Sequence, residues 1–225
     1  MTQNVNHGCI DNTLTGPFLK KFDSKRAFVS YWHQIDEVFK TSSFSILEVG
    51  VGNKFVSLYL ERFGREVTTV DILRGFNPSV NSSVLNLPFK DNSFDVSLCC
   101  EVLEHLPFKN FKKSLLELKR VTASTTIISL PDATPYISIN VDSYIGIFKK
   151  ILDMPIIQRK HVFDGQHHWE IGKKGYLLNK IRQVISESNF NICSTYRVAE
   201  NPYHRFFILR KNDSVKNESR QILKE

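Results

Sequence analysis

Ile46-Leu47-Glu48-Val49-Gly50-Val51-Gly52-Asn53-Lys54 carries the strongest structural signal in this chain. An apolar run suited to a buried strand ends here in two glycines spaced by one residue, and an acid lies two residues before the first glycine. Residues 55–63, which follow at once, carry apolar side chains at helical spacing. The stretch therefore predicts a strand, a tight loop and a helix, a junction at which α/β sheets hold nucleotide-type ligands.

The spacing of the small residues separates two classes of ligand. A dinucleotide-binding loop reads G-x-G-x-x-G/A, because the last small residue lets the helix pack closely on its strand. Counting from Gly50, that place is taken by Phe55. A bulky ring at this position argues against NAD or FAD.

A second acid follows the loop at the interval expected of a βαβ unit. Residues 66–71 are rich in β-branched side chains and end in Asp71. In such units a carboxylate about 20 residues after the glycine loop accepts hydrogen bonds from the ribose hydroxyls of the ligand. We therefore expect Asp71 to lie beside the loop and to bind a ribose.

The most specific pattern is Leu87-Pro88-Phe89, followed after a short gap by Phe94-Asp95-Val96. Together with the acid, the glycines and Asp71, it resembles the class I S-adenosylmethionine-dependent methyltransferases, and most of all their type 11-like small-molecule branch. Family members usually carry an aspartate where this chain has Ser83, and a third glycine where it has Lys54. A hydroxyl at Ser83 accepts the bond from the adenine amino group without the help of charge.

The resemblance implies a Rossmann-like three-layer α/β sandwich. Its seven-stranded sheet is mostly parallel, with an antiparallel C-terminal hairpin strand. It also implies that the protein is an enzyme that uses S-adenosylmethionine. The residues expected to bind this cofactor are Glu48, Gly50, Gly52, Asp71, Ser83, Val84, Leu85 and Glu101.

Periodicity along the rest of the chain agrees with one methyltransferase domain at 23–210, between a flexible arm at 1–22 and a polar tail at 211–225. Helical patterns cover 24–40, 109–121 and 175–188, and strand patterns cover 96–100, 125–131, 191–198 and 205–209. The last two strands are expected to join near Asn201-Pro202. The alternation stops between about 132 and 170, where we expect an insertion that acts as a lid and covers the acceptor.

Composition sets broader bounds. A chain of 225 residues that is 41% hydrophobic can bury one sizeable core. The polar N-terminus and the absence of a membrane span predict a cytoplasmic protein. The four cysteines form no C-x-x-C pair, which favours reduced thiols over a zinc site. The net charge of +7 permits a phosphate-bearing partner, although a solvated basic face is the commoner explanation.

Two groups of side chains are candidates for the chemistry: Glu101, Glu104 and His105 after the fourth strand, and His161, His167, His168 and Glu170 at the end of the insertion. On a helix, the first three would share one face. Of all these, His105, His167 and Glu101 are the candidate catalytic residues, because a general base is needed if the methyl acceptor carries a proton. Glu101, Glu104, His105 and His167 are also a donor set that suits Mg²⁺, Mn²⁺ or Zn²⁺.

Whether the protein binds a metal distinguishes the possible classes of substrate. Similar Glu-x-x-Glu-His segments hold a metal in ubiquinone-biosynthesis O-methyltransferases and in small-RNA 3′-terminal 2′-O-methyltransferases, and the RNA branch adds a motif that His167-His168-Trp169-Glu170 resembles. Many metal-free small-molecule methyltransferases carry the same segment, and the basic residues lack the aromatic platform of a single-strand RNA groove.

We favour methyl transfer, without a metal, to a hydroxyl or amine of a small molecule such as a sugar or lipid intermediate. A metal-dependent RNA 2′-O-methyltransferase is the alternative, and a non-catalytic cofactor-binding module is the second alternative. The sequence leaves the oligomeric state open.

Overall fold

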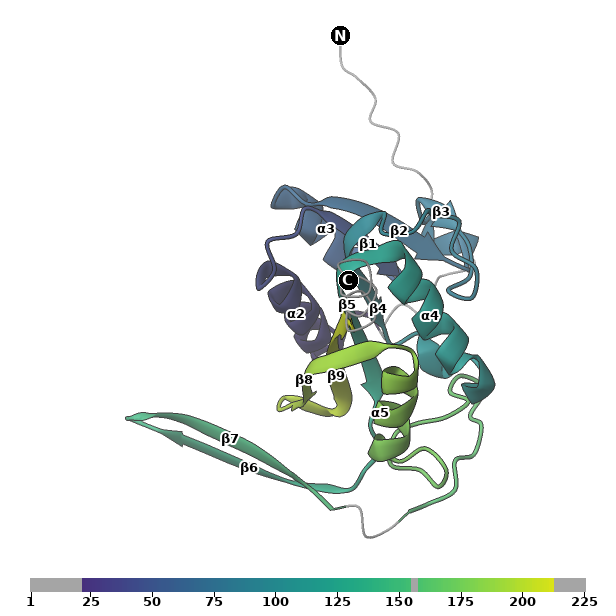
Figure 1. The fold of residues 1–225 in the computed structure, drawn as a ribbon. Helices are drawn as coiled ribbons and strands as arrows, with labels where there is room; N and C mark the ends of the chain where they lie inside the picture. The colour runs from purple at the N-terminus through teal and green to yellow at the C-terminus, as the bar shows by residue number, and fades with distance from the viewer. Residues whose placement is uncertain (1–21, 155–157, 213–225) are drawn as a thin grey trace, which may run out of the picture.

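The computed structural model describes residues 22–154 and 158–212, and its centre is a seven-stranded sheet with helices on both faces (Figure 1). The strands lie in the order β3-β2-β1-β4-β5-β9-β8, and β9 runs antiparallel to both of its neighbours. Their bounds are β1 Ser45–Val49, β2 Glu66–Asp71, β3 Val80–Asn81, β4 Phe94–Cys100, β5 Thr122–Pro131, β8 Phe190–Val198 and β9 Asn201–Lys211. This order confirms the predicted fold class.

Among the residues that the structure describes, four α-helices cover the sheet: α2 Lys25–Phe39, α3 Phe55–Arg62, α4 Phe111–Val121 and α5 Leu178–Glu187. Three short 3-10 helices, Arg74–Phe76, Leu103–His105 and Phe108–Asn110, shape the loops. Ser24 caps α2, because its hydroxyl accepts a hydrogen bond from the backbone N–H of Ala27 at 3.2 Å. All four helices lie within the segments that the sequence predicts.

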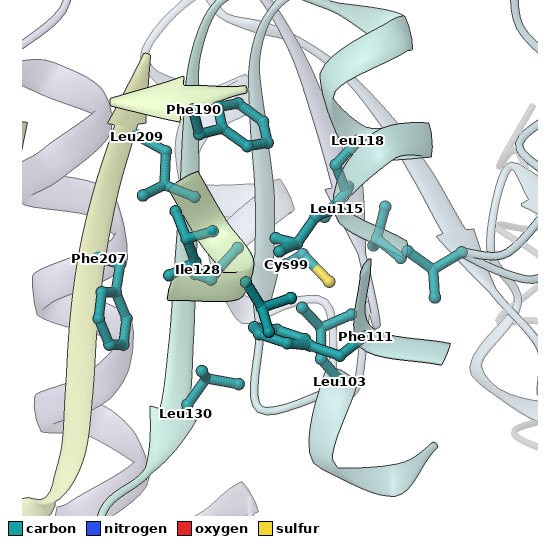
Figure 2. Packing of buried hydrophobic residues seen from close by; sticks show 14 of the residues in the cluster. Cys99, Leu103, Phe111, Leu115, Leu118, Ile128, Leu130, Phe190, Phe207 and Leu209 are labelled. Atoms are coloured by element: carbon teal, nitrogen blue, oxygen red, sulfur yellow. The ribbon is translucent and has the colours of Figure 1, made fainter. Parts of the chain in front are cut away.

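Each face of the sheet has its own apolar core. On the side of α4 and α5, the buried ring of Phe111 and the side chains of Leu115 and Leu118 pack towards Ile128 and Phe207 of the sheet (Figure 2). On the side of α2 and α3, the buried side chains are Val38, Val56 and Leu60 from the helices and Ile46, Val96, Leu98, Ile127, Val198 and Phe206 from the sheet. Because successive strand residues point to opposite faces, the apolar runs of the parallel strands supply both cores.

The aspartate of the Phe94-Asp95-Val96 pattern fastens the amino end of the sheet. Asp95 Oδ2 accepts hydrogen bonds from the backbone N–H groups of Phe44 at 2.8 Å and Ser45 at 3.0 Å. These bonds lower the pKa of Asp95, because they stabilise its charged form. Asp95 therefore ties the start of β1 to β4, a structural role that the sequence pattern alone does not reveal.

The segment at 132–170 contains a two-stranded hairpin, with β6 at Tyr136–Ser143 and β7 at Gly146–Asp153. It forms a separate sheet that extends away from the body of the domain (Figure 1). The sequence predicts the interruption but not its shape. The β8–β9 turn is at Ala199-Glu200, so the predicted joint at Asn201-Pro202 is displaced: both of these residues already belong to β9.

Four charged side chains, three of them buried, fix the base of this hairpin, and we call them the arginine–aspartate cluster: Asp132, Asp153, Arg197 and Arg205. Arg205 donates from Nε to Asp132 Oδ2 at 2.6 Å and from Nη2 to Asp153 Oδ2 at 2.7 Å. Arg197 donates from Nη1 to Asp153 Oδ1 at 2.6 Å, and its guanidinium lies over the Tyr136 ring. The cluster joins β7 to β8, β9 and the end of β5.

The predicted arm and tail lie almost wholly outside the described residues, although Lys211 still belongs to β9. Within the described ranges, no helix is long and apolar enough to cross a membrane. Cys99, Cys100 and Cys193 are free thiols, and Cys9 lies outside the described residues.

Candidate active site

The glycine loop between β1 and α3 depends on three residues with positive φ. Gly50 has φ +84°, Gly52 φ +50° and Lys54 φ +63°. A Cβ on Gly50 would lie 2.2 Å from Val102 Cγ2, so this position needs glycine for space as well as for conformation. Lys54, at the place of the usual third glycine, adopts the left-handed conformation that a glycine takes at less cost.

Asp71 lies beside this loop, as its spacing predicts. It ends β2, which pairs with β1, and its Oδ2 accepts a hydrogen bond from the Val51 N–H at 3.0 Å. Its Oδ1 accepts another from the Leu73 N–H at 2.8 Å. Burial raises the pKa of Asp71, and the backbone donors oppose that shift. The loop therefore holds the carboxylate in one orientation at the carboxyl end of its strand.

Glu48 is a buried carboxylate at the end of β1. Within the described part of the chain, its Oε2 has no hydrogen-bond partner. Burial raises the pKa of Glu48 to about 8, since desolvation disfavours the charged form. A buried carboxyl without a partner suits a site that binds a cationic ligand or a ligand with a hydrogen-bond donor.

Glu48→Gln is expected to stabilise the protein by an amount that grows as the pH rises above 4.5 and is largest above pH 8. Between pH 4.5 and 8 the carboxyl is protonated in the folded state and ionised in the unfolded state, so folding takes up a proton and stability falls as pH rises. The variant loses this penalty, which is about 2 to 5 kcal/mol above pH 8. Urea unfolding at pH 5 and pH 8.5 measures the difference. The exposed Glu66 provides a control in Glu66→Gln, and an equal gain at both pH values for Glu48→Gln would contradict the assignment.

The loop at Ser83–Leu85 lies after β3, and its described contacts are structural. Ser83 Oγ accepts a hydrogen bond from the Leu85 N–H at 3.2 Å, and Val84 is buried. The loop that follows is held from α4 by Arg120, which donates to the backbone carbonyls of Leu87 and Phe89. Arg120 also pairs with Glu117, which accepts from the Leu87 N–H. This pair, which the sequence does not single out, positions the Leu-Pro-Phe motif.

Helix α2 and Phe22 cover the glycine loop from one side. The Phe22 ring lies next to Gly52, so that a Cβ there would meet it at 3.0 Å. The Tyr31 hydroxyl donates to the Phe22 carbonyl at 3.1 Å, and its ring stacks on Phe55 at 5.2 Å between centroids. Phe55, whose size argues against a dinucleotide, thus forms part of this aromatic cover.

The segment after β4 does not form the single helix that the sequence suggests. Glu101 has φ +55° and precedes a short 3-10 helix at Leu103–His105, so the expectation of one shared helical face is wrong. Glu101 Oε1 accepts from the Ser129 hydroxyl at 2.9 Å, and its Oε2 lies 3.5 Å from His204 Nε2. The carboxylate of Glu101 is therefore directed by β5 and β9.

Glu104, His105 and His167 are brought together instead. Each offers one atom, and these atoms lie within 4.8 Å of one another. The rings of His105 and His167 are 5.2 Å apart, and Glu104 is fully buried. Of the four predicted metal ligands, the structure thus groups three, and Glu101 lies outside this group.

The hydrogen bonds of the two imidazoles define their tautomers. His105 Nδ1 lies 3.0 Å from the carbonyl oxygen of Gln166, which only accepts, so this nitrogen donates, and in a neutral ring Nε2 has the lone pair. His167 Nδ1 lies 3.2 Å from Glu170 Oε1. The bond from His167 lowers the pKa of Glu170 to about 2, so this carboxylate accepts the bond, and in a neutral ring the lone pair of His167 is on Nε2.

The two other histidines of the predicted group have different positions. His161 Nε2 is 2.7 Å from the His167 carbonyl, so it supports the backbone of the site. His168 is exposed and stacks on Phe163, with 4.6 Å between centroids. Trp169 is buried in the core, where its Nε1 donates to the Leu106 carbonyl at 3.1 Å.

Tyr203 and His204 are site residues that sequence reasoning missed. The Tyr203 hydroxyl donates to Glu170 Oε1 at 2.7 Å, and burial raises its pKa. His204 pairs with Glu101, as described above, and its register partner on β5 is Pro131. Because β9 is antiparallel, its first residues lie at the carboxyl edge of the parallel strands. A Tyr-His pair at the start of a predicted antiparallel strand was the available signal.

Comparisons with known proteins agree with this geometry. Residues 47–130 match a family described as methyltransferase domain. An uncharacterized protein of Methanocaldococcus jannaschii is 30% identical over 114 residues, which cover 46% of this chain and 40% of that protein, so the match spans less than half of either.

Two solved structures illustrate the likeness in fold. The 1,6-didemethyltoxoflavin-N1-methyltransferase of Burkholderia thailandensis, with 1,6-didemethyltoxoflavin and S-adenosylhomocysteine bound, is similar at a TM-score of 0.57 and 13% identity, over 86% of this chain and 82% of that one. A SAM-dependent methyltransferase from Aquifex aeolicus is similar at a TM-score of 0.55 and 17% identity, over 86% and 96%.

Proposed function

Residues 47–130 belong to a methyltransferase domain family, in a chain with the class I methyltransferase fold, and from this premise we propose that the protein is an S-adenosylmethionine-dependent methyltransferase. Its acceptor is a hydroxyl, or an amine, of a small molecule such as a sugar or lipid intermediate, and the location we propose is the cytoplasm. The family match confirms the resemblance drawn from the glycine loop and the Leu-Pro-Phe motif. The observation that carries the proposal is the convergence of the glycine loop, Asp71 and the His167–Glu170 pair at the carboxyl edge of one sheet.

The residues around the glycine loop fit the proposed cofactor. Gly50 and Gly52 let the backbone approach a ligand, and the Asp71 carboxylate is held next to them by the Val51 N–H. Among the described residues, Glu48 Oε2 has no hydrogen-bond partner, and it supplies a buried acceptor at the end of β1, next to the loop. We assign Glu48, Gly50, Gly52 and Asp71 to the cofactor, with Ser83, Val84 and Leu85 beside its base and Glu101 near its reactive end.

S-adenosylmethionine supplies an electrophilic methyl group, and the protein must place the acceptor in line with it. His167 is the general base that we favour. Its Nε2 takes the proton of the acceptor hydroxyl while Glu170 and Tyr203 hold the ring from the other side, the arrangement of a base directed by a third group. His105 and Glu101 are the other candidates for this role.

Asp71→Ala is expected to weaken S-adenosylmethionine binding about ten- to a hundredfold, because a hydrogen bond to a charged acceptor contributes about 1.5 to 3 kcal/mol. Calorimetry on the full chain measures the change. Asp71→Asn keeps the size of the side chain, and its affinity for S-adenosylmethionine should lie between those of the parent and of Asp71→Ala. Glu66→Ala, at the exposed start of the same strand, should bind like the parent. Unchanged affinity in Asp71→Ala would remove the ribose assignment, and binding of NADH in place of S-adenosylmethionine would overturn the proposed function.

A second candidate is a metal-dependent RNA 2′-O-methyltransferase, and the grouping of Glu104, His105 and His167 favours it. One carboxylate and two imidazoles are a donor set that fits a divalent ion, and Glu170 would be the carboxylate partner that orients a ligating imidazole. A metal there would lower the pKa of a coordinated hydroxyl, as on a 3′-terminal ribose.

EDTA separates the two candidates. For the favoured function, turnover on a panel of hydroxylated small molecules should survive chelation, because His167 needs no metal to act as a base. The second candidate would be established if EDTA abolished turnover, Mn²⁺ restored turnover, and RNA 3′ ends were the only acceptors on the panel. Mn²⁺ titration by calorimetry on the parent and on Glu104→Gln gives a readout that is independent of activity. A non-catalytic module would bind S-adenosylmethionine but turn over no acceptor on either panel.

A further inference from the structure

The β6–β7 hairpin has two chemically different faces. Residues that pair across an antiparallel ladder share a face, so the register places Ile137, Ile139, Val141, Phe148, Lys150 and Leu152 together. All five apolar side chains of this set are exposed, and we call the set the apolar face of the hairpin. At the turn, Tyr144 is 104% exposed and Ile145 94%. Five exposed apolar side chains on one face of an exposed element mark an interaction site.

The opposite face of the hairpin is turned to the domain. Lys149 Nζ lies 2.7 Å from Glu200 Oε1, and the Tyr136 ring lies under the Arg197 guanidinium. A cavity of about 250 Å³ between this face and the body is lined by Ile151, Asp153 and Arg205 among others. With the arginine–aspartate cluster at its base, the hairpin is held so that its apolar face points away from the body.

The dimensions and the charge of the apolar face decide what covers it. Eight residues at about 3.3 Å each, on two strands that are together about 10 Å wide, give a face of roughly 260 Å². A stable protein interface needs about 800 Å² from each partner. The face also carries Lys150, and none of the eight register positions on this face is acidic. Two copies packed face to face would bury two unpaired ammonium groups in a small interface.

We propose that the hairpin docks on the surface of an anionic phospholipid bilayer. Tyr144 and Ile145 enter the headgroup region first, where an aromatic ring with a polar tip is stable. Lys150 keeps its stem among the apolar side chains and its ammonium at the lipid phosphates, and the net charge of +7 attracts an anionic leaflet. Unpaired backbone groups on both edges of the hairpin restrict it to the hydrated interface.

Docking in this way would place the active site near the lipid surface. β6 begins a few residues after β5 ends, so the hairpin leaves the domain at the carboxyl edge of the sheet, the edge that carries Asp71 and Glu101. The docking step itself requires neither cofactor nor acceptor. It can therefore be tested independently of the proposed methyl transfer.

The test is co-sedimentation of the full chain with vesicles of phosphatidylglycerol and phosphatidylcholine, and with vesicles of phosphatidylcholine alone. We expect binding to the anionic vesicles that weakens with salt. The double variant Tyr144→Ser, Ile145→Ser should lower this binding at least tenfold, because both side chains lose their apolar contact with lipid. Lys150→Gln should lower the affinity less and reduce its salt dependence. Leu58→Ser, at an exposed apolar position on α3 outside the hairpin, is the control and should bind like the parent.

Three results would overturn the proposal. The first is that the parent chain does not bind anionic vesicles, and the second is that the double variant still binds them. The third is that the parent chain is a dimer in analytical ultracentrifugation, whereas the double variant or Phe148→Ser is a monomer. The last result would assign the apolar face to a second copy of the chain. The two turn residues have no packing role in the fold, and unchanged thermal unfolding of the double variant verifies that its loss of binding is local.

Discussion

His167→Ala is expected to lower kcat by about a hundred- to ten-thousandfold, the range that a general base contributes. The reason is the geometry of the ring: Nδ1 lies against the Glu170 carboxylate at 3.2 Å, which leaves the lone pair on Nε2 to accept the proton of the substrate. Once the acceptor panel has yielded a substrate, kcat is measured at saturating acceptor and cofactor. The affinity for S-adenosylmethionine should not change, because the glycine loop and Asp71 are intact.

Two further variants separate the chemical role of His167 from a structural one. Glu170→Gln keeps the shape of the positioning residue but removes its charge, and it should lower kcat less than His167→Ala does while the affinity for S-adenosylmethionine stays unchanged. His168→Ala changes the exposed neighbouring imidazole and should leave kcat unaltered. If His167→Ala kept more than a tenth of the parent kcat, His105 or Glu101 would replace it as the base.

Asp132→Asn is expected to destabilise the protein by about 3 to 5 kcal/mol, the cost of removing one partner from a buried ion pair. The Asp132 side chain is fully buried and accepts from Arg205 Nε and from the Thr134 N–H, while its backbone carbonyl accepts from Arg197 Nη2. An amide cannot neutralise two buried guanidinium groups. Urea unfolding at neutral pH measures the loss.

Asp153→Asn is the matched comparison within the same cluster. Its carboxylate contacts the same two arginines, but it is about one third exposed, so water and salt screen its charge. We expect the free energy of unfolding to fall by about 1 kcal/mol, and the hairpin to be held less firmly to the domain. A loss of less than 1 kcal/mol for Asp132→Asn would show that the cluster contributes little to the stability of the domain.

The parts of the site that follow from local spacing were predictable from the sequence. The glycine loop and Asp71 belong to one βαβ unit, whose geometry fixes where a residue at that interval must lie. The alternation Ile137-Ser138-Ile139-Asn140-Val141 also had the period of a strand, although only the interruption of the core pattern was inferred from it.

The parts that depend on backbone conformation or distant register were not predictable. Glu101 leaves the expected helix because it adopts φ +55°, a conformation that nothing in its side chain requires. Tyr203 and Arg205 reach Glu170 and Asp132 through the register between β5 and β9, which the sequence of neither strand specifies. Charges so far apart in the chain give no local signal of their pairing.

The position of β9 has a consequence for the order in which the protein is completed during synthesis. β9 is the last strand along the described chain, yet it lies between β5 and β8 in the sheet. A nascent chain that folds from its N-terminus therefore holds the glycine loop and Asp71 while the edge of β5 is still unpaired. Glu101 and Glu170 gain His204 and Tyr203 only when β9 is inserted. The cofactor half of the protein can thus form on the ribosome before the catalytic half, and the open edge of β5 is the surface that a chaperone would have to protect in the interval.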